Sequence, residues 1–146
     1  MMFQRRRLLL LIAVIAIGGL IPYETTVVPK WKIRVVDETG APYASMRVRQ
    51  SWRHYTLETE PGENSDTRWT DAEGYVEFPE RRLGASILGR VVRSALAVLG
   101  RLLAHGGLGI RAYIDSSGPQ GYRSIDYTPG NPLPASLILP REQKQE

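Results

Sequence analysis

The pattern that most constrains this chain is a four-residue corner, Asp-x-x-Gly, which occurs twice next to strand-like segments. One corner is residues 37–40, after the segment 32–36, and the other is residues 71–74, before the segment 75–78. Aspartate at the first position and glycine at the last are typical of a type I turn followed by a left-handed residue. We therefore expect strands on both sides of each corner, and we expect Gly74→Val to destabilise the chain more than Glu73→Ala.

The segment from Ala44 to Tyr55 alternates between two kinds of side chain. One face carries Met46, Val48, Gln50, Trp52 and His54, and the other carries Arg47, Arg49, Ser51 and Arg53. Such a period of two predicts a half-buried antiparallel strand, because successive side chains of a strand point to opposite faces. We interpret the arginine face as a solvated face, paired with the acidic segment 58–66, rather than as a platform for nucleic acid.

Short strands with turn signals between them recur along the remainder of the chain. Residues 68–70 and 75–78 are predicted to form a hairpin, and the acidic segment 58–66 to form a solvated loop. Further strands are predicted at 110–114, 122–127 and 135–139. Seven such strands indicate a mainly β fold, a two-sheet antiparallel sandwich spanning residues 31–139, with residues 140–146 as a disordered tail.

One helix interrupts this β pattern, over residues 83–104. Its aliphatic residues recur at helical spacing and form a wide apolar face, whereas Ser86, Arg90, Arg93, Ala97 and Arg101 gather on a narrow opposite stripe. We predict Arg90, Arg93 and Arg101 as the polar contacts of an interaction helix. Three readings remain open: a helix that packs across the sandwich and covers one sheet or its open end, a helix on an anionic membrane leaflet, or a helix that binds a partner protein of the cell envelope.

The amino terminus has the order of a membrane signal, with a basic segment at residues 1–7 and sixteen uncharged residues at 8–23. A helix over those sixteen residues covers roughly 24 Å, short of the roughly 30 Å hydrocarbon core, so both an uncleaved anchor and a removed signal peptide remain open. The anchor residues predicted are Leu8, Leu9, Leu10, Leu11, Ile12, Ala13, Val14, Ile15, Ala16, Ile17, Gly18, Gly19, Leu20 and Ile21.

The charge distribution predicts where the remainder of the chain lies. Three arginines precede the apolar run, so the positive-inside rule leaves the amino end in the cytoplasm and places the domain outside it. Residues 24–30 are then predicted to be an extended tether. The expected location is the inner membrane with a single pass, or the periplasm or medium if the signal is cleaved.

Composition excludes several classes of function. The chain has no cysteine, which excludes disulfide scaffolds, iron–sulfur clusters and thiol nucleophiles. The net charge of +4 falls to +1 without Arg5, Arg6 and Arg7, so the body is nearly neutral and we expect no nucleic-acid partner.

The two corners and their flanking residues resemble a known family. The segments Val35-Val36-Asp37-Glu38-Thr39-Gly40-Ala41-Pro42 and Thr70-Asp71-Ala72-Glu73-Gly74-Tyr75-Val76-Glu77-Phe78 resemble the carboxypeptidase regulatory-like domains, which share the transthyretin-like (prealbumin-like) sandwich. The resemblance covers residues 31–78 and implies a noncatalytic accessory or adhesion-like module in an exported or cell-surface protein. The helix at 83–104 departs from that family's pattern.

The sequence offers no catalytic set. Residues 36–42 also resemble a motif of the enzyme hydroxyisourate hydrolase. However, the segment 32–34 lacks that enzyme's histidine, and Tyr122-Arg123-Ser124 lacks the glycine of its terminal motif. His54 and His105 have no metal-ligand spacing, and we expect no cofactor or metal. The expected function is a noncatalytic binding or scaffold module; the alternative is a small-ligand-binding protein or enzyme with a pocket between sandwich and helix, contacted by Arg111, Tyr113 or Tyr122.

Overall fold

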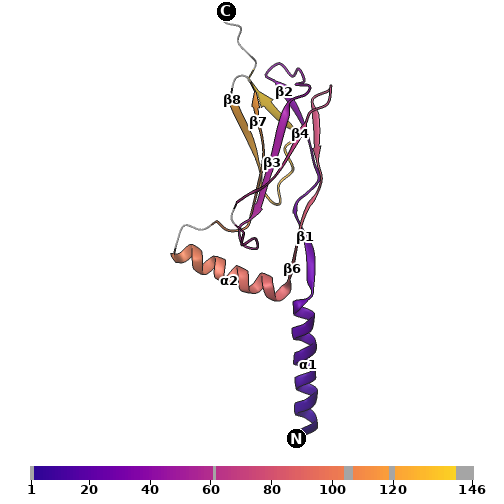
Figure 1. Ribbon diagram of the computed structural model, residues 1–146, viewed down its shortest axis with the longest axis vertical. Helices are drawn as coiled ribbons and strands as arrows, with labels where there is room; N and C mark the ends of the chain where they lie inside the picture. Colours follow the sequence, from indigo (N-terminus) through magenta and orange to yellow (C-terminus); the bar gives the residue numbers. More distant parts are fainter. Residues whose placement is uncertain (1, 61, 104–106, 119–120, 141–146) are drawn as a thin grey trace, which may run out of the picture.

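The computed structural model describes residues 2–60, 62–103, 107–118 and 121–140. Within these ranges the chain forms two helices and nine strands. In chain order they are α1 (Met2–Leu20), β1 (Pro22–Val28), β2 (Trp31–Asp37), β3 (Arg47–His54), β4 (Asn64–Trp69), β5 (Tyr75–Phe78), β6 (Arg81–Ser86), α2 (Ile87–Leu103), β7 (Ile110–Gly118), β8 (Gly121–Tyr127) and β9 (Ser136–Leu139). The strands form an elongated body, α1 extends from one end of it, and α2 lies across that same end (Figure 1).

Two of the three sheets in the described residues hold the strands of the body. One has the order β5-β2-β9 and the other the order β4-β3-β7-β8. Every strand pair is antiparallel except β2 with β9, which is parallel. The prediction of a mainly β fold built largely from antiparallel sheets is confirmed, whereas the count is nine strands and not seven.

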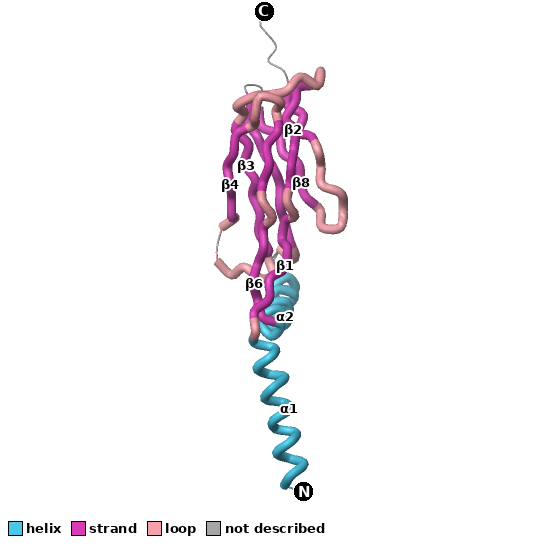
Figure 2. The backbone as a smooth tube through the Cα atoms, turned by 90° about the vertical axis from the view of Figure 1, so that its right-hand side faces the viewer, coloured by secondary structure: helices cyan, strands magenta, loops and turns pink. Residues whose placement is uncertain are grey.

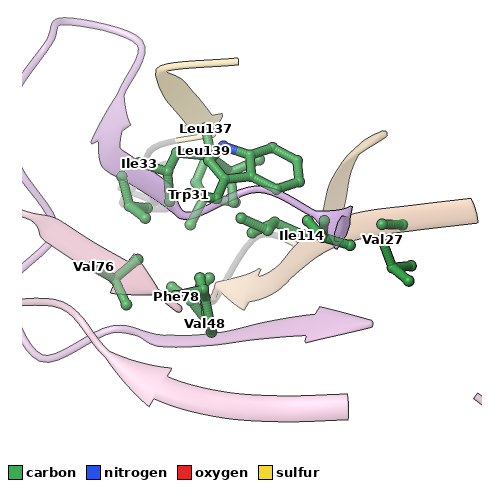
Figure 3. Packing of buried hydrophobic residues seen from close by; sticks show 12 residues of the cluster. Val27, Trp31, Ile33, Val48, Val76, Phe78, Ile114, Leu137 and Leu139 are labelled. Carbon is green, nitrogen blue, oxygen red and sulfur yellow. The ribbon is translucent and has the colours of Figure 1, made fainter. Parts of the chain in front are cut away.

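Side chains from both body sheets meet in one buried cluster. Trp31 and Ile33 of β2, Val48 of β3 and Ile114 of β7 are fully buried, and Leu137 of β9 is almost so. Figure 3 shows these side chains converging between the strands. The alternation predicted for β3 thus has its physical cause here, because Val48 faces this cluster while its neighbours Arg47 and Arg49 are exposed.

The two Asp-x-x-Gly corners have the same geometry. In each, an aspartate carboxylate oxygen accepts hydrogen bonds from the amide N–H groups two and four residues later, at 2.8 and 2.9 Å for Asp37 and at 3.1 and 2.7 Å for Asp71. Gly40 and Gly74 have φ angles of +86° and +81°. The turns predicted at both corners are therefore confirmed, including the left-handed glycine.

The second corner does not close a hairpin, contrary to the prediction for 68–70 and 75–78. Strand β4 pairs with β3, and β5 pairs with β2, so the chain crosses from one sheet to the other at Asp71. Hydrophobic burial explains the crossing, because Val76 and Phe78 are buried in the core, opposite Ile33 and Trp31 of β2. Strand β4 also begins at Asn64, inside the segment predicted as a loop.

Strands β1 and β6 form a separate antiparallel ribbon, which corrects two predictions. Residues 24–30 are not a tether, since most of them belong to β1, and the helix begins at Ile87 rather than at residue 83. The ribbon register runs from Pro22 opposite Ser86 to Val28 opposite Arg81. Burial of Val27 and Val28 in the core cluster provides the stabilisation that makes this segment a strand.

The ribbon is fixed to the four-stranded sheet by Arg81. Its guanidinium donates to the side-chain oxygen of Gln50 at 3.0 Å, forms an ion pair with Asp66, and lies 4.2 Å from the ring centroid of Trp52. Burial alone would raise the pKa of Asp66, but hydrogen bonds from Arg81 and Arg68 outweigh it and lower that pKa. The ribbon is therefore positioned by contacts that lie far apart in the sequence.

Helix α1 continues directly from the ribbon and stands apart from the strands (Figure 2). From Leu8 to Ile17 all its side chains are exposed, including Leu9 at 65% and Val14 at 66%. Among the described residues, no helix is both long enough and apolar enough to span a membrane. Residues 1 and 141–146 lie outside the described ranges, so the predicted tail is described only at Pro140.

Candidate functional site

The most unusual part of the surface is the end of the body where α1, the β1–β6 ribbon and α2 meet. Because Pro22 pairs with Ser86, the end of α1 and the beginning of α2 lie side by side at the tip of the ribbon. From there α2 runs across the end of the body, whereas α1 extends away from it (Figure 1). At about 1.5 Å per residue, its 17 residues span roughly 25 Å along the base of the body.

Arg90 holds the first turn of α2 to the ribbon. Its guanidinium donates to the backbone carbonyl oxygens of Tyr23, Leu83 and Ala85 at 3.1 to 3.3 Å. It also lies 4.3 Å from the ring centroid of Tyr23, a cation–π distance. Arg90 therefore joins both ribbon strands to the helix, which is a positioning role that the sequence pattern did not reveal.

Contacts further along the chain hold the rest of α2 near the body. Arg93 donates to the carbonyl oxygen of Leu57, in the turn after β3. Beyond the helix, Gly107 approaches the ring of Tyr55 so closely that an added Cβ would lie 2.9 Å from ring carbons. The amide of Gly109 donates to the Thr56 hydroxyl at 2.9 Å. The helix is thus tied to the body at its beginning, in its second turn and after its end.

These ties give α2 an orientation opposite to that of an ordinary surface helix. Arg90, Arg93 and Ala97 are on the narrow stripe that faces the body, whereas all of the large apolar side chains are on faces that do not. None of its residues, all of which are described, is buried. The exposed apolar face of α2 consists of Ile87, Leu88, Val91, Val92, Leu96, Val98, Leu99, Leu102 and Leu103.

The three arginines predicted for an interaction helix consequently have different roles. Arg90 and Arg93 donate to backbone carbonyl oxygens, although Arg93 is still exposed, and Arg101 is exposed in the last turn. Helix α2 does lie across one end of the body, as one form of the packing reading expects, but its apolar face is not buried there, since none of the helix residues is buried. A tertiary contact such as Arg93 with Leu57 has no local sequence signal, since 36 residues separate the pair.

The structure does have a depression between the body and α2, with a volume of about 320 Å³. Its rim is acidic, with Glu58, Glu60 and Glu63 opposite Arg93. None of the three residues predicted to contact a ligand lines it. Tyr113 instead donates a hydrogen bond to Glu63 at 2.8 Å on the outer face of the four-stranded sheet, where Arg111 also lies. Tyr122 lines a second depression, together with Arg49 and Asp115.

The predicted arginine face of β3 is engaged within the molecule. Arg49 donates to the carboxylate of Asp115 at 3.0 Å, and this hydrogen bond and charge raise the pKa of Arg49. Arg53 donates to the carbonyl oxygen of Glu60, in the acidic loop, and lies over the ring of Tyr55. The contact predicted between this face and the acidic loop is therefore present.

The histidines show no metal-binding arrangement in the described ranges. His54 ends β3, and burial lowers its pKa, with the charge of Arg90 acting in the same direction. Its Nδ1 atom is buried and has no hydrogen-bond partner among the described residues. No three histidine, aspartate or glutamate side chains of the described residues are grouped closely enough to hold a metal ion. His105 lies outside the described residues.

Comparison with known proteins found no family model that matches the chain, and no curated protein or solved structure that is significantly similar to it.

Proposed function

We propose that this chain is a membrane-anchored, noncatalytic binding or scaffold module of the carboxypeptidase regulatory-like type, displayed outside the cytoplasm. In this proposal α1 is a single-pass anchor in the inner membrane, or a signal helix before cleavage, and the strands form a transthyretin-like sandwich. The observation that carries it is α1 itself. This helix exposes an uncharged run from Leu8 to Leu20 that no strand covers, directly after Arg5, Arg6 and Arg7.

The body supports the proposed class through its two matching corners and its two core-forming sheets. Without β1 and β6, the strands number three and four in the two sheets of the described residues, and their buried side chains share one cluster. Both corners carry the aspartate bonding and left-handed glycine that the family pattern requires. The β1–β6 ribbon and α2 are additions that join this body to α1.

The anchor is tested by fractionating cells that express the full chain. We expect it to remain in the membrane pellet after alkaline carbonate extraction, and Val14→Arg to release it, because a charge near the centre of the bilayer costs about 3 kcal/mol. Thr67→Arg is the matched control, since Thr67 is an exposed position on β4. Recovery of the unaltered chain in the soluble fraction, at its full mass, would contradict the anchor.

The side of the membrane is tested with a single cysteine, because the chain has none of its own. Ser124→Cys places a thiol on the exposed strand β8. In spheroplasts we expect a membrane-impermeant maleimide to label it without lysis. Labelling that requires lysis would place the body in the cytoplasm and overturn the proposal. The mass of the labelled chain distinguishes an intact anchor from a cleaved signal peptide.

A further inference from the structure

We propose that α2 lies flat in the interfacial layer of the bilayer, with its exposed apolar face inserted among the lipids beside α1. This inference rests on the proposed function, because it needs α1 to cross that same bilayer. It assigns α2 a second membrane contact, which fixes how the body stands on the surface.

The arginines of α2 set the direction of its apolar face. Arg90 and Arg93 turn the polar stripe of α2 toward the ribbon and the body. The apolar side chains therefore face away from the strands, and their exposed fractions run from 48% at Val92 to 80% at Leu103. A helix held by its polar side leaves its apolar face for a surface outside the domain.

The apolar face of α2 also has a defined position relative to α1. Helix α2 runs across the base of the body, which lies on one side of it, while α1 extends away on the other side (Figure 1). The apolar face therefore looks toward the side where α1 extends. The ribbon tip places Ile87 beside the end of α1, so a bilayer around α1 has its surface at the level of α2.

All of the charged residues of α2 are basic. Between Ile87 and Leu103 the charged residues are Arg90, Arg93 and Arg101, with no acid. Wide apolar faces with arginines on the polar side are typical of helices that lie in a membrane interface. Among the described residues Arg90 and Arg93 donate to backbone carbonyls and not to carboxylates, so no ion pair offsets their charge beside an anionic leaflet.

A further observation concerns the junction. Tyr23 lies at the base of the ribbon, 45% exposed, with Arg90 stacked on its ring. Aromatic rings and arginines of this kind concentrate at the level of lipid headgroups. The junction of α1, ribbon and α2 therefore carries the side chains expected where a chain leaves a bilayer.

The test measures the depth of single spin labels in the full chain, reconstituted in vesicles of phosphatidylcholine and phosphatidylglycerol. The cysteine-free chain allows one label each at Val14→Cys on α1, Leu99→Cys on the apolar face and Ser94→Cys beside the polar stripe. Val92→Cys, two turns before Leu99 on the same line, repeats the measurement should one variant be misfolded. Collision rates with oxygen, which concentrates in lipid, are compared with those of a water-soluble nickel chelate.

We expect oxygen collisions to exceed nickel collisions at Val14, Leu99 and Val92, and the ratio to be lower at Ser94. If the label at Val14 is in lipid but the labels at Leu99 and Val92 collide with nickel as often as the label at Ser94, α2 is not inserted and this inference is overturned. The proposed anchor is not contradicted by that result. If Leu99 and Val92 are shielded from both reagents, a second copy or a partner protein covers the face, and the inference is overturned. If Val14 itself is in water, the proposed anchor is wrong as well.

Discussion

Replacement of Gly74 by alanine tests the corner geometry on which the fold depends. The φ of +81° disfavours any residue with a Cβ by about 1–2 kcal/mol. At Gly74 that Cβ would also lie 2.7 Å from the carbonyl oxygen of Val35 and 2.9 Å from the Cβ of Pro42. Overpacking of this kind costs about a further 1–3 kcal/mol. We therefore expect Gly74→Ala to lower the free energy of unfolding by about 2–5 kcal/mol.

Gly40→Ala is the matched control, because it occupies the same place in the other corner. Its φ is +86°, but an added Cβ meets no atom within 4 Å. The expected loss is about 1–2 kcal/mol, from the backbone conformation alone. Urea denaturation of the full chain in detergent, followed by tryptophan fluorescence, to which the fully buried Trp31 contributes, measures both. Equal losses at the two glycines would refute the argument that Gly74 is packed against Val35 and Pro42.

Three further predictions concern charged groups. Because the pKa of Asp66 is lowered in the folded state, its carboxylate stabilises the fold above the unfolded pKa of about 4, and this stabilisation is lost as the pH falls below that value. Asp66→Asn should therefore reduce the loss of stability at acid pH, measured by urea denaturation. Because burial lowers the pKa of His54, stability should decline as pH falls below the unfolded value near ~6.5, and His54→Gln should remove that decline. Arg90→Lys should speed hydrogen exchange in the first turns of α2, since lysine cannot span three carbonyl oxygens, whereas Arg101→Lys should leave exchange unchanged.

The parts of the fold that were predictable have local causes. The corners at Asp37 and Asp71 depend on residues two to four positions apart, and the alternation in β3 depends on neighbouring side chains. The β1 strand was missed although Thr25, Thr26, Val27 and Val28 form a β-branched run that favours a strand. The residues of the partner strand β6 lie partly within the amphipathic pattern that predicts a helix from residue 83, so the sequence does not indicate this pairing.

The candidate site was predictable in composition but not in arrangement. The amphipathic pattern of α2 and its arginines are visible in the sequence, and the usual rule places such a helix with its apolar face on the core. The contacts of Arg90 with Tyr23 and of Arg93 with Leu57 reverse that orientation. Sequence spacing contains no signal for either pair.

Local residue patterns are sufficient to indicate the turns, the alternating strand, the apolar amino-terminal run and the amphipathic helix. The assignment of β4 and β5 to different sheets, the pairing of β1 with β6 and the direction of the apolar face of α2 depend on contacts between distant segments. These two kinds of feature differ in the range of the forces that cause them. Backbone preferences and side-chain periodicity act within a few residues, whereas strand pairing and the carbonyl partners of an arginine depend on which distant segments burial brings together.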